Sequence, residues 1–230
     1  MSNAVFKKIE SYHQDVIDLQ EKLVAFKSVG PDSDGPGESE KAAFVKLYLE
    51  AMGFEQIVQL DAPDSRVPDG KRPNLLAKWI VDASKPTVWI MAHLDVVPAG
   101  DLNLWKSDPF QLQVEGDKLI GRGVEDNHQG LVSALLACKA LRETNTVPGR
   151  NIGLAIVADE EAGSTYGLGY LMEHHRDRFS KDDLIIVPDA GDPDGVTIEV
   201  KEKSIAWMKF VVNGKQCHAS TPSAGINAHK

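Results

Sequence analysis

Apolar residues recur along the first quarter of the chain at the spacing of amphipathic helices. Residues 5–26 and residues 38–52 carry apolar side chains every three or four positions, and the second run stops at Gly53, a residue that favours a helix end. The turn formers of residues 30–37 separate the two runs. Residues 60–73 show neither helical nor strand periodicity, so we expect an irregular loop there.

From residue 75 onward, short apolar runs predict strands. They cover residues 75–80, 87–92, 151–158 and 183–187, and helical patterns at residues 130–142 and 166–175 lie between the later ones. Alternating strands and helices are typical of an α/β fold with a largely parallel sheet. The sequence therefore predicts an α/β domain over most of the chain.

The pattern changes again near Lys201. Residues 204–212 are strand-like and end at Asn213-Gly214, which is a turn signal. The segment that remains, residues 201–230, is too short to bury a core of its own. We therefore expect a domain boundary near residue 200, and we expect this chain to be the first portion of a longer protein.

Composition narrows the class of protein. The formal net charge is -9 and the pI is near 5.3, whereas nucleic-acid-binding proteins are more often basic, so we expect no nucleic-acid partner. Cys138 and Cys217 match no metal-binding or disulfide spacing. No run approaches the ~20 apolar residues of a membrane span, and the N-terminus lacks a secretory pattern. We expect a cytoplasmic protein that binds no membrane.

Polar, mostly acidic side chains stand where the predicted strands end. The segments that carry them are His93 to Asp95, Asp126, Asp159 to Glu161, and Asp189. Ligands of open α/β sheets bind at the carboxyl ends of the strands, so the four segments are expected to meet at one edge of the sheet.

One imidazole with several carboxylates is a ligand set for divalent metals, zinc included. A carboxylate can bridge two ions ~3.5–4 Å apart that share one water. Of the neighbours Glu160 and Glu161, one can bind metal while the other stays free as a general base. Each motif alone is more often a turn or a helix start, but the four together favour a two-metal hydrolase.

In this combination the chain resembles the zinc-dependent exopeptidases and deacylases, the family of carboxypeptidase G, succinyl-diaminopimelate desuccinylase, acetylornithine deacetylase, aminoacylase and several dipeptidases. The matching text lies in residues 91–98, 105–110, 121–126, 158–164, 188–189 and 214–220. The resemblance implies a three-layer α/β/α catalytic domain with a mostly parallel sheet over residues 1–200. Residues 201–230 would begin a smaller α+β lid or dimerisation domain of a homodimer.

The resemblance also implies roles for individual residues. His93 and Asp189 would bind the first of two divalent ions, and Glu161 would bind the second. Asp126 would bridge both ions, which are most often zinc, with cobalt or manganese as alternatives. Glu160 would be the general base that activates the metal-bridging water, Asp95 would orient the His93 ring, and His218 on the lid would stabilise the oxyanion.

Three features depart from the family pattern. Many members have lysine and glycine two and three positions after the bridging aspartate, where this chain has His128 and Gln129. Residue 189 is Asp where some members have Glu. The last histidine of the second metal site, which the family supplies after the lid, has no counterpart here. The remaining histidines, His128 among them, we expect at the surface or in helices.

Two other hypotheses stay open. A catalytically inactive fragment or metal-binding module would keep the fold and lack that late histidine. An aminopeptidase of the related sheet fold would share the His, Asp and paired Glu, although residues 214–218 favour the first family. The sequence predicts a metal-dependent hydrolase of amide bonds in small peptides or N-acyl amino acids.

Overall fold

The computed structural model describes residues 3–189, 195, 197–201 and 208–229. The chain divides into two compact units, Met1–Ala190 and Gly191–Lys230. The division into domains at residue 200 stays a prediction.

The first unit opens with helices, divided differently from the sequence prediction. α1 (Asn3–Glu10) and α2 (His13–Ala25) replace the single helix expected over residues 5–26. Tyr12, between the two helices, is buried, and its hydroxyl donates a hydrogen bond to Glu143 at 3.0 Å. α3 (Ser39–Ala51) follows as predicted, and Gly53 beyond it has the left-handed φ of 78° that favours glycine. No helix in the described part of the chain is long and apolar enough to cross a membrane.

A five-stranded sheet forms the centre of the first unit, with strand order β1-β2-β6-β3-β7. The strands are β1 (Gln56–Pro63), β2 (Lys71–Trp79), β3 (Thr87–His93), β6 (Asn151–Val157) and β7 (Leu184–Ile186). β3 pairs in parallel with both β6 and β7, while β2 is antiparallel to both β1 and β6. All strands except β2 therefore run in one direction, which confirms the α/β fold with a mostly parallel sheet. A separate small hairpin joins β4 (Gln113–Glu115) to β5 (Lys118–Ile120).

The loop expected over residues 60–73 is confirmed for residues 64–70 and wrong at both ends, where residues 60–63 and 71–73 belong to β1 and β2. β1 and β2 pair in one continuous antiparallel register, from Gln56 opposite Lys78 to Pro63 opposite Lys71. The polar residues that suggested a loop interact across the two strands, with Lys71 Nζ 2.8 Å from Asp61 Oδ2. The strand expected over residues 204–212 lies partly outside the described residues, and residues 208–212 are not in a strand.

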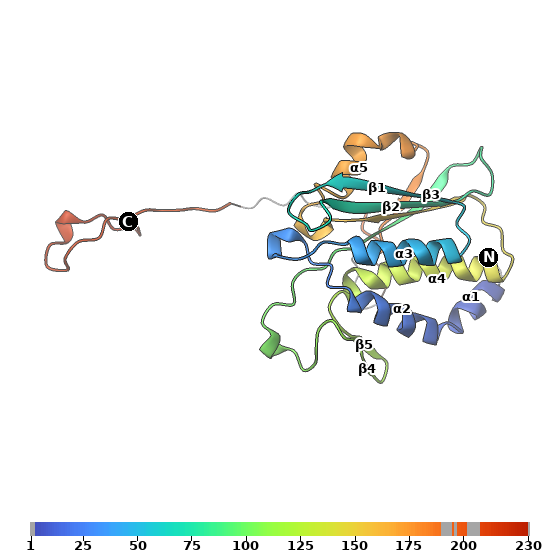
Figure 1. The fold of residues 1–230 in the computed structure, drawn as a ribbon, viewed down its shortest axis with the longest axis horizontal. Coiled ribbons are helices and arrows are strands. Elements are labelled where there is room, and N and C mark those ends of the chain that lie inside the picture. Colours follow the sequence, from blue (N-terminus) through green and yellow to red (C-terminus); the bar gives the residue numbers. More distant parts are fainter. Residues whose placement is uncertain (1–2, 190–194, 196, 202–207, 230) are drawn as a thin grey trace. The chain divides into compact units, whose positions relative to one another are not determined.

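Helices cover both faces of the sheet, as Figure 1 shows: α1 to α4 lie on one face and α5 (Leu168–His174) on the other. α4 (Gly130–Glu143) contributes several side chains to the larger core, among them Leu131 and Leu135. On the opposite face, Leu171 of α5 and the rings of Trp89 and Phe179, which contact each other at a tilt of 50°, contribute to a smaller core. The three-layer arrangement is confirmed. Residues 184–187, by contrast, are apolar yet 52–55% exposed.

The second unit contains the short helical turn η6 (Pro222–Ala224) among its described residues. A bridge between Lys215 and Ile226 closes the loop around it.

Candidate metal centre

The strands bring the predicted site residues to one edge of the sheet. β3 lies between β6 and β7 and is parallel to both, so the carboxyl ends of all three strands lie at the same edge. His93 is the last residue of β3, and Glu160 and Asp189 follow β6 and β7 within a few residues. Asp126 comes from η3 (Val124–Gln129), the segment before α4, at a position where the backbone is not helical (φ -102°, ψ 97°). The predicted convergence is confirmed for these residues.

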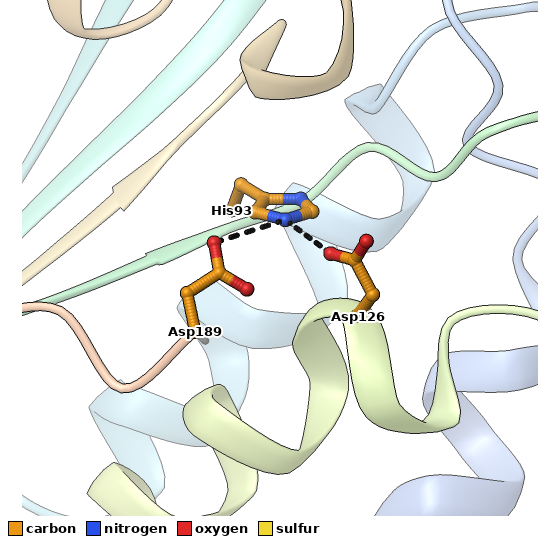
Figure 2. A group of neighbouring side chains, drawn as sticks. All are labelled: His93, Asp126 and Asp189. Carbon is orange, nitrogen blue, oxygen red and sulfur yellow. Dashed lines mark hydrogen bonds and ion pairs between the residues drawn. The ribbon is translucent and has the colours of Figure 1, made fainter. Parts of the chain in front are cut away.

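Three of the predicted metal ligands form a compact group. His93 Nε2 lies 2.9 Å from Asp126 Oδ1 and 3.7 Å from Asp189 Oδ2. Figure 2 shows the His93 ring with both carboxylates turned toward its Nε2. The ligand atoms of the three residues lie within 4.8 Å of one another, close enough to hold one ion. His93 is 2% exposed and the Asp126 side chain is 59% exposed, so the group opens to solvent on the Asp126 side.

Hydrogen bonding fixes the orientation of the His93 ring. Its Nδ1 donates to the backbone oxygen of Asp95 at 3.0 Å, which leaves Nε2 facing the carboxylates. Burial lowers the pKa of His93, but the surrounding carboxylates, with Asp95 first, outweigh burial and hold the pKa above its usual value. The group therefore attracts positive charge strongly, and one imidazole with two carboxylates is a donor set that fits zinc.

The Asp95 carboxylate is buried and contacts two parts of the site. Its oxygens accept hydrogen bonds from the backbone N–H groups of Glu160 and Glu161, both at 3.0 Å. One of the same oxygens lies 3.6 Å from His93 Nδ1. Asp95 thus holds the turn that carries the glutamate pair, whereas the hydrogen bond that orients the ring goes to its backbone oxygen; the orienting role of its carboxylate stays a prediction.

The two glutamates face different partners. Glu160 Oε2 lies 3.8 Å from His93 Nε2, while Glu161 Oε1 accepts a hydrogen bond from the backbone of Val97 at 3.2 Å. Burial raises the pKa of both carboxyls, and the pKa of Glu161 rises to about 7 with the charge of Asp126 as the next cause. The two carboxylates are therefore placed differently enough for one to accept a proton while the other binds metal.

Sequence reasoning missed an ion cluster behind the glutamate turn. Arg72 of β2 is completely buried, and its Nε donates to Glu38 at 2.7 Å while another guanidinium nitrogen lies 3.2 Å from Asp159 Oδ1. Asp159 has the left-handed φ of 62°, and its other oxygen accepts from the backbone of Tyr166 at 2.9 Å. Arg72 therefore holds the residue immediately before Glu160. No local sequence pattern predicts the buried position of Arg72, because its partners are distant in sequence.

His128 lies in η3, so of the two placements expected for it, in a helix or at the surface, the structure shows the first and not the second. The ring is buried, and its Nε2 lies 2.7 Å from Nζ of the buried Lys41 of α3. Burial lowers the pKa of Lys41 to about 7 and holds the pKa of His128 well below its usual value. An amine from α3 thus lies beside the position where many family members have a lysine.

His218 belongs to the second unit and is exposed. Its Nδ1 lies 2.8 Å from the hydroxyl of Ser220. The oxyanion role that the resemblance implies for His218 stays a prediction.

Comparison with known proteins agrees with the motifs. A family model described as peptidase family M20/M25/M40 matches residues 89–225, more than half of the chain. An uncharacterised metallohydrolase of Methanococcus maripaludis is 43% identical over 228 residues, 96% of this chain and 54% of the relative. A succinyl-diaminopimelate desuccinylase of Wolbachia pipientis is 30% identical over 93% of this chain and 50% of its own length.

Among solved structures, human carnosine dipeptidase 1 is similar with a TM-score of 0.70 and 29% identity, covering 81% of this chain and 40% of that one. The chain spans about half the length of the curated relatives it matches. The family resemblance read from the sequence is confirmed: the chain belongs to the M20/M25/M40 family of peptidases.

Proposed function

We propose that this chain carries the catalytic metal centre of a hydrolase that cleaves amide bonds in small peptides or N-acyl amino acids. The observation that carries the proposal is the position of the Glu160 carboxylate beside the group of His93, Asp126 and Asp189. Family membership supports the reaction class, because relatives include a dipeptidase and a desuccinylase.

The proposed cofactors are two divalent ions, zinc first, with cobalt or manganese as alternatives. His93, Asp126 and Asp189 would hold one ion, and Asp126 and Glu161 would contribute to holding the other. When bound, such ions lower the pKa of water and polarise a carbonyl oxygen.

Protein groups would carry the proton. Glu160 would accept a proton from the attacking water on a carboxylate oxygen and deliver it to the nitrogen of the leaving amine. Asp95 would keep Glu160 in reach, because its carboxylate holds the backbone of the glutamate turn at 3.0 Å. Attack of the water oxygen on the carbonyl carbon and departure of the amine would complete hydrolysis.

The remaining proposals concern the whole protein. The apolar and half-exposed residues 184–187 support further polypeptide that covers β7 in a longer protein, since strands of parallel sheets are normally buried on both faces. That polypeptide would supply the last histidine of the second ion site. We keep the lid domain from residue 201 with His218, the homodimer and the cytoplasmic location as parts of the proposal.

A metal-binding module without activity is the second candidate. The observation that favours it is that the described residues bring together one group of three potential ligands, His93, Asp126 and Asp189, and no second such group. On this view the chain holds one ion and hydrolyses nothing.

Paired variants of the two glutamates test the proposal in the full-length protein. Glu160→Gln should lower turnover of dipeptides or N-acyl amino acids at least ~10²-fold with unchanged metal content, because glutamine cannot accept the proton. Glu161→Gln should instead lower the metal content. Amine release and elemental analysis are the measurements, and a Glu160→Gln variant that keeps its turnover or loses metal would contradict the assigned roles.

A further inference from the structure

Asn127 has no part in the proposed chemistry, yet its side chain bonds to two of the segments that carry the metal group. It is 0% exposed. Its Oδ1 accepts a hydrogen bond from the backbone N–H of His93, and its Nδ2 donates to the backbone oxygen of Pro188, both at 3.3 Å. One buried amide therefore joins His93 to the residue before Asp189, and Asn127 itself directly follows Asp126.

The sheet does not join these segments by itself. The pairing of β3 with β7 runs from Val88 opposite Leu184 to Ile90 opposite Ile186. His93 and Asp189 both lie beyond the last of these pairs. Beyond the last strand pair, the Asn127 side chain links the backbone of His93 to that of Pro188, next to Asp189.

We propose that Asn127 is a positioning residue that sets the spacing of His93, Asp126 and Asp189 before an ion binds. This inference rests on the proposed metal centre. Without the amide, the His93 N–H and the Pro188 oxygen would lose the partner that Asn127 gives them. Pairing with β6 would still hold His93, but the segment of Pro188 and Asp189 would be free to move away from it. Ion binding would then have to order the ligands, and the free energy spent on this would lower the metal affinity.

Packing around the amide leaves it little freedom. A Cβ placed on Gly130, the first residue of α4, would clash with the Pro188 oxygen and lie 3.1 Å from Asn127 Nδ2. The helix thus approaches the Pro188 carbonyl so closely that only glycine fits. Gly130→Ala offers a second way to disturb the same junction without touching a ligand.

The experiment compares Asn127→Leu with Asn151→Leu. Asn151 is an equally buried amide at the opposite end of the sheet, where its Oδ1 accepts from Val81 and Asp82 at 2.9 and 3.1 Å. Both variants should unfold at lower temperature. Zinc affinity, measured by competition with a chromophoric chelator, should fall ~10–100-fold in Asn127→Leu, as for other residues that orient ligands, and stay within ~3-fold in Asn151→Leu.

Two further readouts separate the possible failures. In metal-free protein, the His93 amide hydrogen should exchange with solvent faster in Asn127→Leu than in the parent. Gly130→Ala should also weaken zinc binding, although alanine favours helices. If Asn127→Leu does not fold, the zinc affinity of Gly130→Ala tests the role of Asn127 in its place. A parent that binds no zinc contradicts the metal centre and with it this inference. If Asn127→Leu and Gly130→Ala both bind zinc as tightly as the parent, or if Asn151→Leu loses as much zinc affinity as Asn127→Leu, the role of Asn127 is overturned and the metal centre is not.

Discussion

Replacing Arg72 by methionine removes the charge at the centre of the buried ion cluster. The side chains of Arg72 and Glu38 are both 0% exposed, and Arg72 donates to both oxygens of the Glu38 carboxylate. Methionine fills much of the volume of the arginine stem and provides no charge. Glu38 would then be a buried carboxylate without its partner.

The cost follows from the protonation of Glu38. A buried carboxylate without a partner takes up a proton, and holding a glutamate of ordinary pKa protonated at pH 7 costs about 3.7 kcal/mol. This agrees with the ~3–5 kcal/mol that breaking a buried ion pair costs. Burial already raises the pKa of Glu38 while Arg72 lowers it, so loss of Arg72 raises the pKa further. A protein with a carboxyl whose pKa is raised by folding becomes less stable as pH rises and more stable as pH falls. The stability lost in Arg72→Met should therefore shrink to about 1 kcal/mol at pH 5.

Urea unfolding followed by circular dichroism at pH 5 and pH 7 measures this difference. Lys71→Met is the matched control, because Lys71 is the neighbouring residue and its ion pair with Asp61 is partly exposed, so its loss should cost less than ~1 kcal/mol. Adding Glu38→Gln to Arg72→Met should recover part of the stability, since residue 38 then carries no charge, while the buried carboxylate of Asp159 still lacks its partner. A cost of Arg72→Met that is below ~1 kcal/mol at pH 7, or equal at the two pH values, would refute the reasoning.

Three further predictions concern single sites. Burial lowers the pKa of Lys41 to about 7, so the unfolded chain binds more protons between that pH and the ordinary lysine pKa; stability should rise across this window, and Lys41→Met should abolish the rise in melting temperature. A Cβ on Gly153 would clash with the ring of Trp89, so Gly153→Ala should cost ~1–3 kcal/mol in urea unfolding, whereas Gly149→Ala, in open space, should be nearly neutral. In the full-length protein, His218→Ala should lower kcat by ~10²–10³ and leave metal content unchanged; equal kcat would contradict the oxyanion role.

The central strands and the site could be predicted from the sequence. The apolar runs at residues 87–92 and 151–158 are the pattern of parallel strands buried on both faces, and they became β3 and β6. His93 and Glu160 follow these runs closely, so the general position of ligands in open α/β sheets was enough to expect them together.

The other features depend on contacts between distant residues. Asp61 and Pro63 are residues that favour turns, but pairing with β2 outweighs that preference and places them in β1. Arg72 resembles a surface residue in the sequence, and its partners Glu38 and Asp159 are 34 and 87 positions away. No local pattern can reveal a buried side chain whose hydrogen bonds cross the whole fold.

Zinc titration of this chain by calorimetry tests the account most directly. We expect one tight site per chain from His93, Asp126 and Asp189. The second site should be weak or undetectable, because Glu161 and the shared Asp126 are the two ligands proposed for it in this chain. His93→Ala should weaken the tight site by at least ~10²-fold, since it removes a ligand, whereas His174→Ala at an exposed position should leave the affinity unchanged. Absence of zinc binding, or equal affinity of His93→Ala and the parent, would contradict the metal centre.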